Sequence, residues 1–131
     1  MCNIWKTKNI PELAAKEYKK ITHMDFVNIS GGEPFLRSDL PEIIGYLAEG
    51  NNKTITICTN GLVPGIIKKI DEIYKIYPDI RIVVAIDGIN EKHDYIRGVD
   101  GAYNKAIKVL EYLATTKIIR RIGFTASDYN V

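Results

Sequence analysis

Strand-like and helix-like segments alternate along this chain, and the alternation limits its fold more than any other feature. Residues 26–29, 54–59, 80–86 and 118–125 have the apolar, β-branched character of strands. Amphipathic helical patterns lie between and around them, over residues 11–20, 40–50, 64–76 and 102–116. Such alternation predicts one α/β domain over residues 1–131, with parallel strands, right-handed crossovers and helices packed outside the sheet.

The predicted strands differ in character. Residues 80–86 are nearly all valine and isoleucine, which is typical of a parallel strand covered on both faces. An irregular link is expected between this strand and the helix that begins at Ala102. Each strand ends in polar or glycine residues, and parallel strands end at one edge, so we expect these groups to line a single site. The groups are Gly31-Gly32-Glu33, Thr59-Asn60-Gly61, Asp87-Gly88 and Thr125-Ala126-Ser127.

The first of these groups has the clearest chemical character. A short strand over residues 26–29, predicted to be buried, leads into Gly31 and Gly32, where the backbone can adopt positive φ or come close to a ligand. Glu33 offers an anionic acceptor suited to an ammonium group, and Pro34 stiffens the exit. The same residues also suit a plain strand-to-helix turn with a solvated glutamate, so on their own they leave both interpretations open.

Composition excludes several classes of function. A formal net charge of +2 gives no nucleic-acid footprint. The longest apolar run, residues 82–86, is far shorter than the roughly 20 residues of a membrane span, so no membrane partner is expected. Cys2 and Cys58 form no disulfide framework, which favours a reducing, cytoplasmic location. Cys58 is expected to be a small core residue, and His23 and His93, which lack metal-ligand spacing, to be structural or exposed.

Four segments together resemble the radical S-adenosylmethionine (SAM) superfamily, in the branch of peptide- and cofactor-modifying enzymes that includes the molybdopterin-precursor cyclase. Residues 29–34 resemble its GGE motif, and Thr59-Asn60-Gly61 resembles its third strand end. Residues 85–103, Ala-Ile-Asp-Gly followed by His-Asp, Arg-Gly and Gly-Ala-Tyr, are similar to its fourth strand and the following link. The serine usual at position 85 is alanine here. Residues 122–130 resemble its fifth strand.

The resemblance implies a (β/α)6 partial TIM-like barrel and a [4Fe–4S] cluster that binds SAM. Such a cluster passes one electron to SAM, giving methionine and a 5′-deoxyadenosyl radical that takes a hydrogen from the substrate. The family holds the cluster with a C-x-x-x-C-x-x-C loop, and Cys2-Asn-Ile-Trp resembles its third cysteine and the residues that follow. We therefore expect a domain truncated at both ends, with four strands present and the first and sixth missing.

The resemblance also implies roles for individual residues, and it names no catalytic side chain. Cys2 would be an iron ligand. Gly31, Gly32 and Glu33, followed by Pro34, would hold the SAM amino group. Asn60 and Asp87 would border the ribose, and Arg97 would pair with the SAM carboxylate or fix its own loop. The remaining SAM contacts, near the adenine, would be Gly123 and Thr125.

One cysteine cannot supply three cluster ligands. We therefore expect this chain alone to hold no intact cluster and to show no radical activity, and its substrate, a small molecule or a peptide, stays unknown. Unpaired edge strands would favour a homodimer. Two other classes stay open: a non-catalytic relic or interaction module of the same fold, and an unrelated partial-barrel lyase or isomerase.

Overall fold

The computed structural model describes residues 11–131, so Cys2 and its neighbours lie outside the described part of the chain. Within that part, two short 3-10 helices, four strands and four α-helices follow one another. In chain order they are η2 (Ala15–Lys20), β1 (Val27–Ile29), η3 (Pro34–Leu36), α1 (Leu40–Glu49), β2 (Ile55–Thr59), α2 (Ile66–Ile76), β3 (Arg81–Ala85), α3 (Glu91–Arg97), α4 (Ala102–Ala114) and β4 (Ile119–Gly123).

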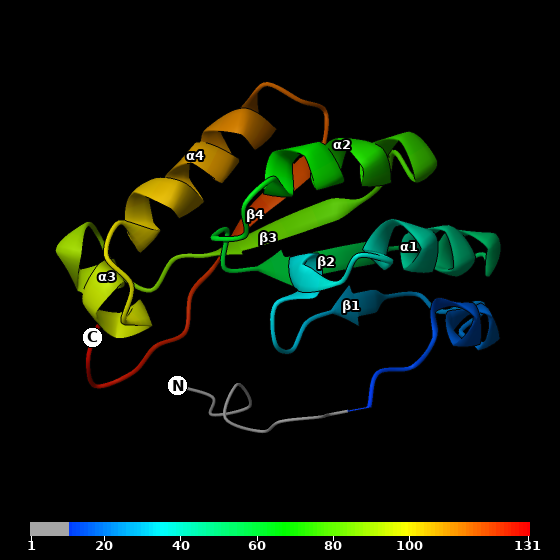
Figure 1. Ribbon diagram of the computed structural model, residues 1–131, viewed down its shortest axis with the longest axis horizontal. Coiled ribbons are helices and arrows are strands. Elements are labelled where there is room, and N and C mark those ends of the chain that lie inside the picture. The colour runs from blue at the N-terminus through cyan, green and yellow to red at the C-terminus, as the bar shows by residue number, and fades with distance from the viewer. Residues whose placement is uncertain (1–10) are drawn as a thin grey trace.

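The strands form one parallel sheet whose spatial order, β1-β2-β3-β4, is also their order along the chain. Every crossover therefore steps one strand in the same direction, as in the wall of a barrel and unlike a doubly wound sheet. Helices α1, α2 and α4 lie over one side of the sheet (Figure 1). The predicted α/β class with four parallel strands is confirmed, and the arrangement is consistent with part of a TIM-like barrel.

Isoleucine and leucine side chains form the core between the sheet and these helices. Ile57 of β2 and Ile82 of β3 are fully buried, as are Leu47 of α1, Ile70 of α2 and Leu113 of α4. Burying each such side chain stabilises the fold by about 1.5–3 kcal/mol. The core thus fixes the helix-bearing face of the sheet and, with it, the positions at which the strands end.

Two expectations about burial were wrong, since within the described residues the helices cover one side of the sheet only (Figure 1). Strand β3 was expected to be covered on both faces, but Ile82 and Val84 are buried while Arg81, Val83 and Ala85 between them keep exposed surface. The first strand was expected to be buried, yet it is an edge strand with one partner, and Phe26 beside it is 55% exposed.

Two segments have different local structure from that expected. The helical pattern at residues 11–20 forms only the 3-10 helix η2. The link after β3, expected to be irregular, contains helix α3, which ends at Gly98 with φ 66°. The carboxylate of Asp94 accepts hydrogen bonds of 2.7 Å from the backbone N–H groups of Gly101 and Tyr103, at the start of α4. These contacts join α3 to α4, so the link is ordered by its own polar residues instead of an apolar stripe.

Among the described residues no helix combines the length and the apolar composition needed to cross a membrane. Strands β1 and β4 form the edges of the sheet. Pairing of a second copy along these edges stays a prediction.

The turn between β2 and α2 gives a direct test of the packing of α4. Gly61 (φ +75°) and Gly65 (φ +74°) share a left-handed conformation that costs other residues about 1–3 kcal/mol. A Cβ at Gly61 would lie 3.0 Å from the Cα of Ala106 in α4, whereas one at Gly65 would meet nothing within 4 Å. We expect Gly61→Ala to lower the free energy of unfolding by about 1–3 kcal/mol more than Gly65→Ala, measured by urea denaturation. Equal losses would show that α4 does not press on this turn.

Candidate functional site

A small hollow lies where β1, β2 and β3 end. Its volume is about 170 Å³, and its lining comes from the loop after β1, the end of β2 and β3, and the last turn of α3. Gly31 (φ 88°) and Gly32 (φ 53°) both adopt the left-handed conformation that glycine tolerates best. The lining residues are Ser30, Gly31, Gly32, Glu33, Cys58, Thr59, Asn60, Ala85 and Arg97.

The carboxylate of Glu33 joins the glycine loop to the end of β2. Its Oε1 accepts hydrogen bonds from the hydroxyl of Thr59 (2.8 Å) and from the backbone N–H of Phe35 (3.1 Å). Its Oε2 accepts one from the backbone N–H of Asn60 (2.8 Å). A carboxylate has about four lone-pair sites, so three are already used. Glu33 therefore holds the shape of the glycine loop and keeps little capacity for a ligand.

Thr59 lies in the strand-end group that was expected to line the site, but no role was predicted for its side chain. Its side chain is buried, donates to Glu33 and accepts a 3.0 Å hydrogen bond from the backbone N–H of Gly61. The next side chain, Asn60, accepts a 2.8 Å hydrogen bond from the backbone N–H of Leu62 through its Oδ1. This leaves the amide NH2 of Asn60 as the group able to face the hollow. A threonine directly before the Asn-Gly strand end was the only available signal.

Asp87 and Arg97 form a second connection, between the ends of β3 and α3. Asp87 is 4% exposed, and its Oδ2 lies 2.6 Å from the Nη2 of Arg97. The Nε of Arg97 is buried and has no hydrogen-bond partner among the described residues, although a guanidinium carries five N–H donors. Because Arg97 also lines the hollow, it offers spare donors to an anionic group there.

The chain that leaves β4 is tied to the same aspartate. The Oδ1 of Asp87 accepts a 3.1 Å hydrogen bond from the backbone N–H of Thr125. Asn130 donates its amide hydrogens to the backbone carbonyls of Asp87 (2.9 Å) and Thr125 (2.8 Å), and its Oδ1 accepts from the backbone N–H of Ser127 (2.7 Å). Asn130 was absent from the predicted site because it follows the last strand by several residues.

The sequence-predicted residues therefore divide into three groups. Gly31, Gly32, Glu33, Asn60 and Arg97 meet at the hollow. Asp87 is joined to the hollow through its ion pair with Arg97, and Thr125 is bonded to Asp87. Gly123 pairs with Ala85 in the sheet.

Of the other predicted residues, Pro34 lies elsewhere, Cys2 is not among the described residues, and Cys58 differs from its expected place. Pro34 is buried at the start of η3 and lines a different hollow, on the side of η2. Cys2 lies outside the described residues. Cys58, expected in the core, is half-buried, and its thiol lies 3.3 Å from the Oδ1 of Asn28 on the face of the sheet away from the helices.

His93 is fully buried and supports the turn after β3. Its Nδ1 accepts a 3.0 Å hydrogen bond from the backbone N–H of Asp87, which requires the neutral ring with its hydrogen on Nε2. Burial lowers the pKa of His93 below the ordinary 6.5, and the charge of Arg97 lowers it further, against smaller opposing effects of Asp87 and Asp94. The expectation that His93 is structural agrees with this contact, and the alternative that it is exposed was wrong.

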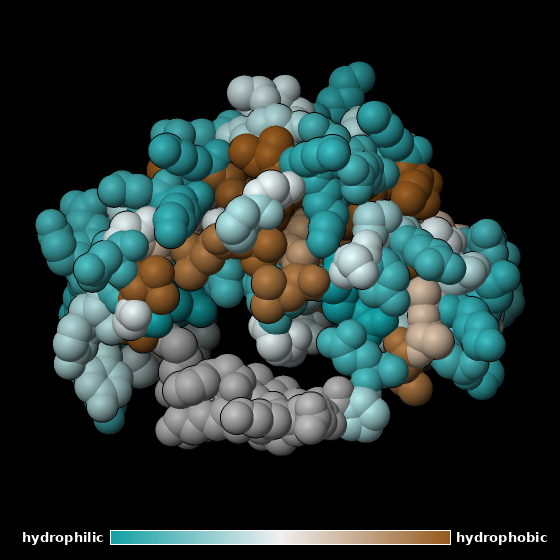
Figure 2. Space-filling view, in the orientation of Figure 1, coloured by the Kyte–Doolittle hydropathy of each residue, from teal (hydrophilic) through white to brown (hydrophobic). Residues whose placement is uncertain are grey.

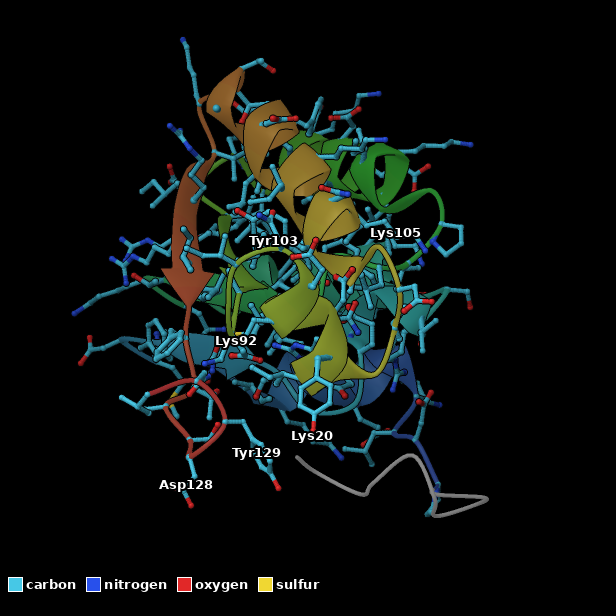
Figure 3. The ribbon with its side chains drawn as sticks, turned by 90° about the vertical axis from the view of Figure 1, so that its left-hand side faces the viewer. Lys20, Lys92, Tyr103, Lys105, Asp128 and Tyr129 are labelled. Carbon is cyan, nitrogen blue, oxygen red and sulfur yellow. The ribbon has the colours of Figure 1, made fainter. Side chains whose placement is uncertain are left out.

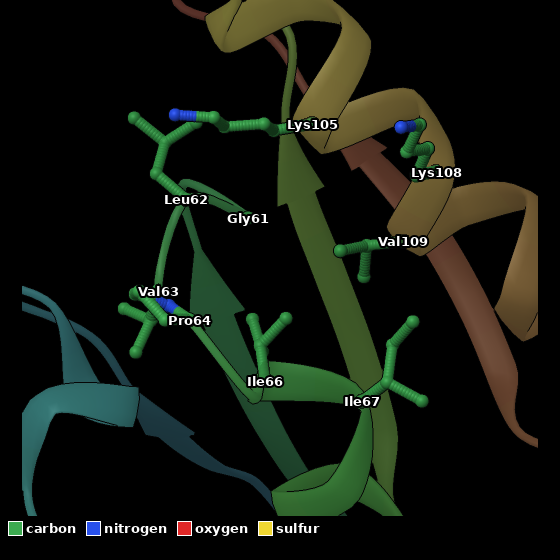
Figure 4. Close-up of a pocket in the computed structure, with 9 residues that line it drawn as sticks. All are labelled: Gly61, Leu62, Val63, Pro64, Ile66, Ile67, Lys105, Lys108 and Val109. Carbon is green, nitrogen blue, oxygen red and sulfur yellow. The ribbon is translucent and has the colours of Figure 1, made fainter.

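A larger groove of about 350 Å³ lies on the opposite, helix-bearing side of the molecule. It runs between the β2–α2 turn and α4, with Lys105 and Lys108 beside its apolar residues (Figure 4). Apolar side chains gather across the middle of this face, between hydrophilic ends (Figure 2). No strand end of the described sheet brings polar groups into this groove, so the site is assigned to the smaller hollow.

The pKa of His93 predicts how stability depends on pH. The folded chain binds a proton at position 93 less readily than the unfolded chain, so stability is lost as the pH falls through about 6.5 toward the lowered folded pKa. We expect His93→Asn to reduce the loss of unfolding free energy between pH 7.5 and pH 5.5. The matched variant is His23→Asn, at an exposed histidine with φ 57°, and it should keep the full loss. An unchanged pH dependence in His93→Asn would contradict this interpretation.

Comparisons with known proteins agree with the geometry. The radical SAM superfamily model matches residues 4–127. The chain is 36% identical over 104 residues to an Fe-coproporphyrin III synthase of Methanosarcina barkeri, covering 78% of this chain and 25% of that protein. It is 34% identical over 109 residues to mycofactocin maturase MftC of Mycolicibacterium smegmatis, covering 81% and 25%. For a probable GTP 3',8-cyclase of Methanococcus vannielii the identity is 33% over 104 residues, covering 78% and 33%.

The sequence thus spans about a quarter to a third of the length of these relatives. The family model, in contrast, extends over nearly all of it, from the residues before η2 to the loop after β4. On this evidence the chain belongs to the radical SAM superfamily.

Proposed function

We propose that this chain is part of the catalytic domain of an enzyme that reductively cleaves SAM, and that the hollow binds the amino-acid end of SAM. The observation that carries the proposal is the meeting of Gly31, Gly32, Asn60 and Arg97 at the carboxyl edge of a parallel sheet. In α/β folds this edge is where ligands bind.

The residues of the hollow can accommodate the ammonium and carboxylate groups of an amino acid. A Cβ at Gly31 or Gly32 would meet nothing within 4 Å, so the loop leaves room for an ammonium group to approach its backbone. Arg97 has unused donors for a carboxylate, including a buried Nε. Glu33 acts as a positioning residue, because three protein donors already bind its carboxylate.

The ribose and adenine are assigned to the neighbouring strand ends. Asn60 borders the ribose through its free amide NH2, and Gly123 and Thr125 lie toward the adenine. Asp87 supports this part of the site through Arg97 and Thr125 and makes no direct contact, because it is buried and both of its carboxylate oxygens are engaged. The reactions of the relatives do not identify a substrate for this chain.

The [4Fe–4S] cluster of the family would supply the electron for SAM cleavage. The described residues do not fit such a cluster, because they contain no group of three side chains able to hold a metal ion. The whole sequence has two cysteines, Cys2 and Cys58, whereas a [4Fe–4S] cluster is typically bound by four. We propose that Cys2 contributes one ligand and that these 131 residues alone hold no complete cluster and have no radical activity.

Binding of SAM tests the hollow directly. Gly31→Ala places a methyl group at the hollow, and we expect it to weaken SAM binding about tenfold in isothermal titration calorimetry. Gly101→Ala is the matched control, since Gly101 has a similar φ of +72°, equally open surroundings and a position in the α3–α4 loop. Both variants should lose similar stability, about 1–3 kcal/mol. Equal SAM affinity in the two variants would contradict the assignment.

Iron and sulfide content tests the proposal about the cluster. After anaerobic reconstitution we expect some iron but fewer than four irons per chain, and we expect Cys2→Ser to remove the bound iron while Cys58→Ser retains it. The reason is that only Cys2 falls in the segment that resembles the cluster loop. Four irons per wild-type chain would overturn the proposal, and iron lost only in Cys58→Ser would move the ligand to β2. Absence of iron from wild type would favour a relic that kept the fold.

A further inference from the structure

The face of the sheet away from the helices is basic and polar, and its chemistry is not used by the SAM hollow. Ile82 and Val84 pack against the helices, so Arg81, Val83 and Ala85 point to the other face. Strand β4 follows the same alternation. Gly123 lies on the face of Val83, because a Cβ at Gly123 would be 3.0 Å from the Val83 Cγ1.

The alternation places Arg121 on the same face as Arg81, and Arg120 on the face of the helices. Arg121 is two residues before Gly123 and pairs with Val83, whereas Arg120 pairs with the buried Ile82. Because Arg81 pairs with Ile119, the two arginines are one strand and two residues apart. This corresponds to roughly 8 Å between their Cα atoms, from a spacing of about 4.8 Å and a rise of about 3.3 Å per residue.

Nothing acidic in the sheet neutralises these two arginines. The four strands contain no aspartate or glutamate, and no described carboxylate forms an ion pair with Arg81 or Arg121. Residues 1–10 also contain no acidic residue. The carboxylates nearest the SAM hollow are already engaged, Glu33 by hydrogen bonds and Asp87 by Arg97. The face therefore carries uncompensated positive charge.

The part of this face on β1 and β2 is polar, beside the apolar Val83, Ala85 and Ile119 of β3 and β4, unlike the interior of an ordinary barrel. Barrel interiors are usually filled by valine, isoleucine and leucine. Here Asn28, Thr56 and Cys58 occupy the corresponding positions on β1 and β2, with Asn28 and Thr56 paired in register and Arg81 beside Thr56. Thr56 is 3% exposed, and its hydroxyl has no hydrogen-bond partner among the described residues. A buried hydroxyl without a partner is destabilising, and a polar ligand beside Arg81 would satisfy it.

Helices lie on one side of β4 and none of the described helices lies on the other (Figure 3). On the face away from the helices, Arg121 is exposed and Arg81 keeps part of its surface exposed. Ala85 lines the hollow assigned to SAM and belongs to the same face, four residues after Arg81, so the face leads from Arg81 to the SAM site over roughly 13 Å.

We propose that this face, through Arg81, Arg121 and Thr56, binds the oxyanion groups of an anionic small-molecule substrate, carboxylate or phosphate. The proposal rests on the proposed function, because it names the substrate class for the same domain. Arginine matches both groups, since its planar fork of donors binds either in a bidentate way. Charge complementarity selects the occupant: a cationic or wholly apolar molecule would leave two arginines unpaired beside it.

Binding of two simple probes tests the proposal, with citrate for carboxylates and inorganic pyrophosphate for phosphates. Each is titrated into the chain at low ionic strength and followed by isothermal titration calorimetry. We expect at least one probe to bind, and Arg81→Gln and Arg121→Gln each to weaken it fivefold or more. Arg120→Gln removes an equal charge from the adjacent position on the opposite face and should change the affinity less than twofold. The probe that binds more tightly identifies the group.

Three results would overturn the proposal. These are no binding of either probe, equal weakening by Arg120→Gln and Arg121→Gln, and no weakening by the variants at 81 and 121. Titration of SAM into the same variants separates this failure from failure of the proposed function. SAM affinity should be unchanged in all three variants, because none of these arginines lines the SAM hollow. Absence of probe binding to the unmodified chain, with normal SAM binding, rejects only the oxyanion face.

Discussion

Two carboxylates hold the strand ends together, and the site depends on them. Glu33 joins the loop after β1 to the end of β2, and Asp87 joins the end of β3 to α3 and to the chain leaving β4. In each case the carboxylate accepts at least one backbone N–H, so the bond fixes the course of the main chain as well as a side chain. Loops that follow parallel strands have no sheet partner of their own, and these contacts supply the missing order.

This arrangement gives the acidic residues a different role from the one that the sequence suggests. From the sequence alone, a glutamate beside two glycines is expected to bind an ammonium group. In the folded chain the same carboxylate is surrounded by donors from the protein, and the open acceptors are the backbone carbonyls of the glycine loop. The group with capacity to spare is Arg97, whose partner Asp87 uses only part of its guanidinium. The acids thus position the loops, and the backbone and the arginine are left to bind the ligand.

Much of the fold could be predicted because apolar periodicity reports what the helices bury. The segments of β2, α1, α2 and α4 were located to within a few residues, and the shared edge of the strand ends followed from parallel pairing. Burial on the second face could not be predicted, because Arg81 in a run of valine and isoleucine looks the same whether or not another layer covers it. Helix α3 was missed because its order comes from Asp94, which binds backbone N–H groups at the start of α4, and from Gly98, whose N–H donates to carbonyls of the last turn of α3.

The site was predictable in part, for a related reason. Gly31, Gly32, Asn60 and Arg97 were recognisable because they belong to ordered motifs, and the structure brings them to one hollow. Asn130 was missed, and the role of Thr59 was not predicted although its strand end was, since a threonine in a strand and an asparagine in a loop have no distinctive pattern. Their roles appear only when the strands are adjacent, because each bonds to a residue 26 or 43 positions away. Contacts over such separations are a property of the tertiary structure alone.

The two faces of the sheet have different tasks in this description. The helix-bearing face is apolar and provides stability, while the opposite face carries Arg81, Arg121 and Asn28 in positions where a simple core would place branched apolar residues. Two arginines on one sheet face, without an acidic partner among the described residues, suit a ligand of opposite charge. The polar face and the glycine hollow adjoin each other at Ala85, which brings the proposed substrate next to the proposed SAM site.

Mapping of SAM onto the backbone amides by NMR tests the central claim most directly. The chain, labelled with nitrogen-15, would be titrated with SAM while each amide resonance is followed. We expect the largest shifts at Gly31, Gly32, Asn60 and Gly123, and none at Lys105 in the groove between α2 and α4. Shifts confined to that groove, or no shifts at millimolar SAM, would contradict the assignment of the strand-end hollow as the SAM site.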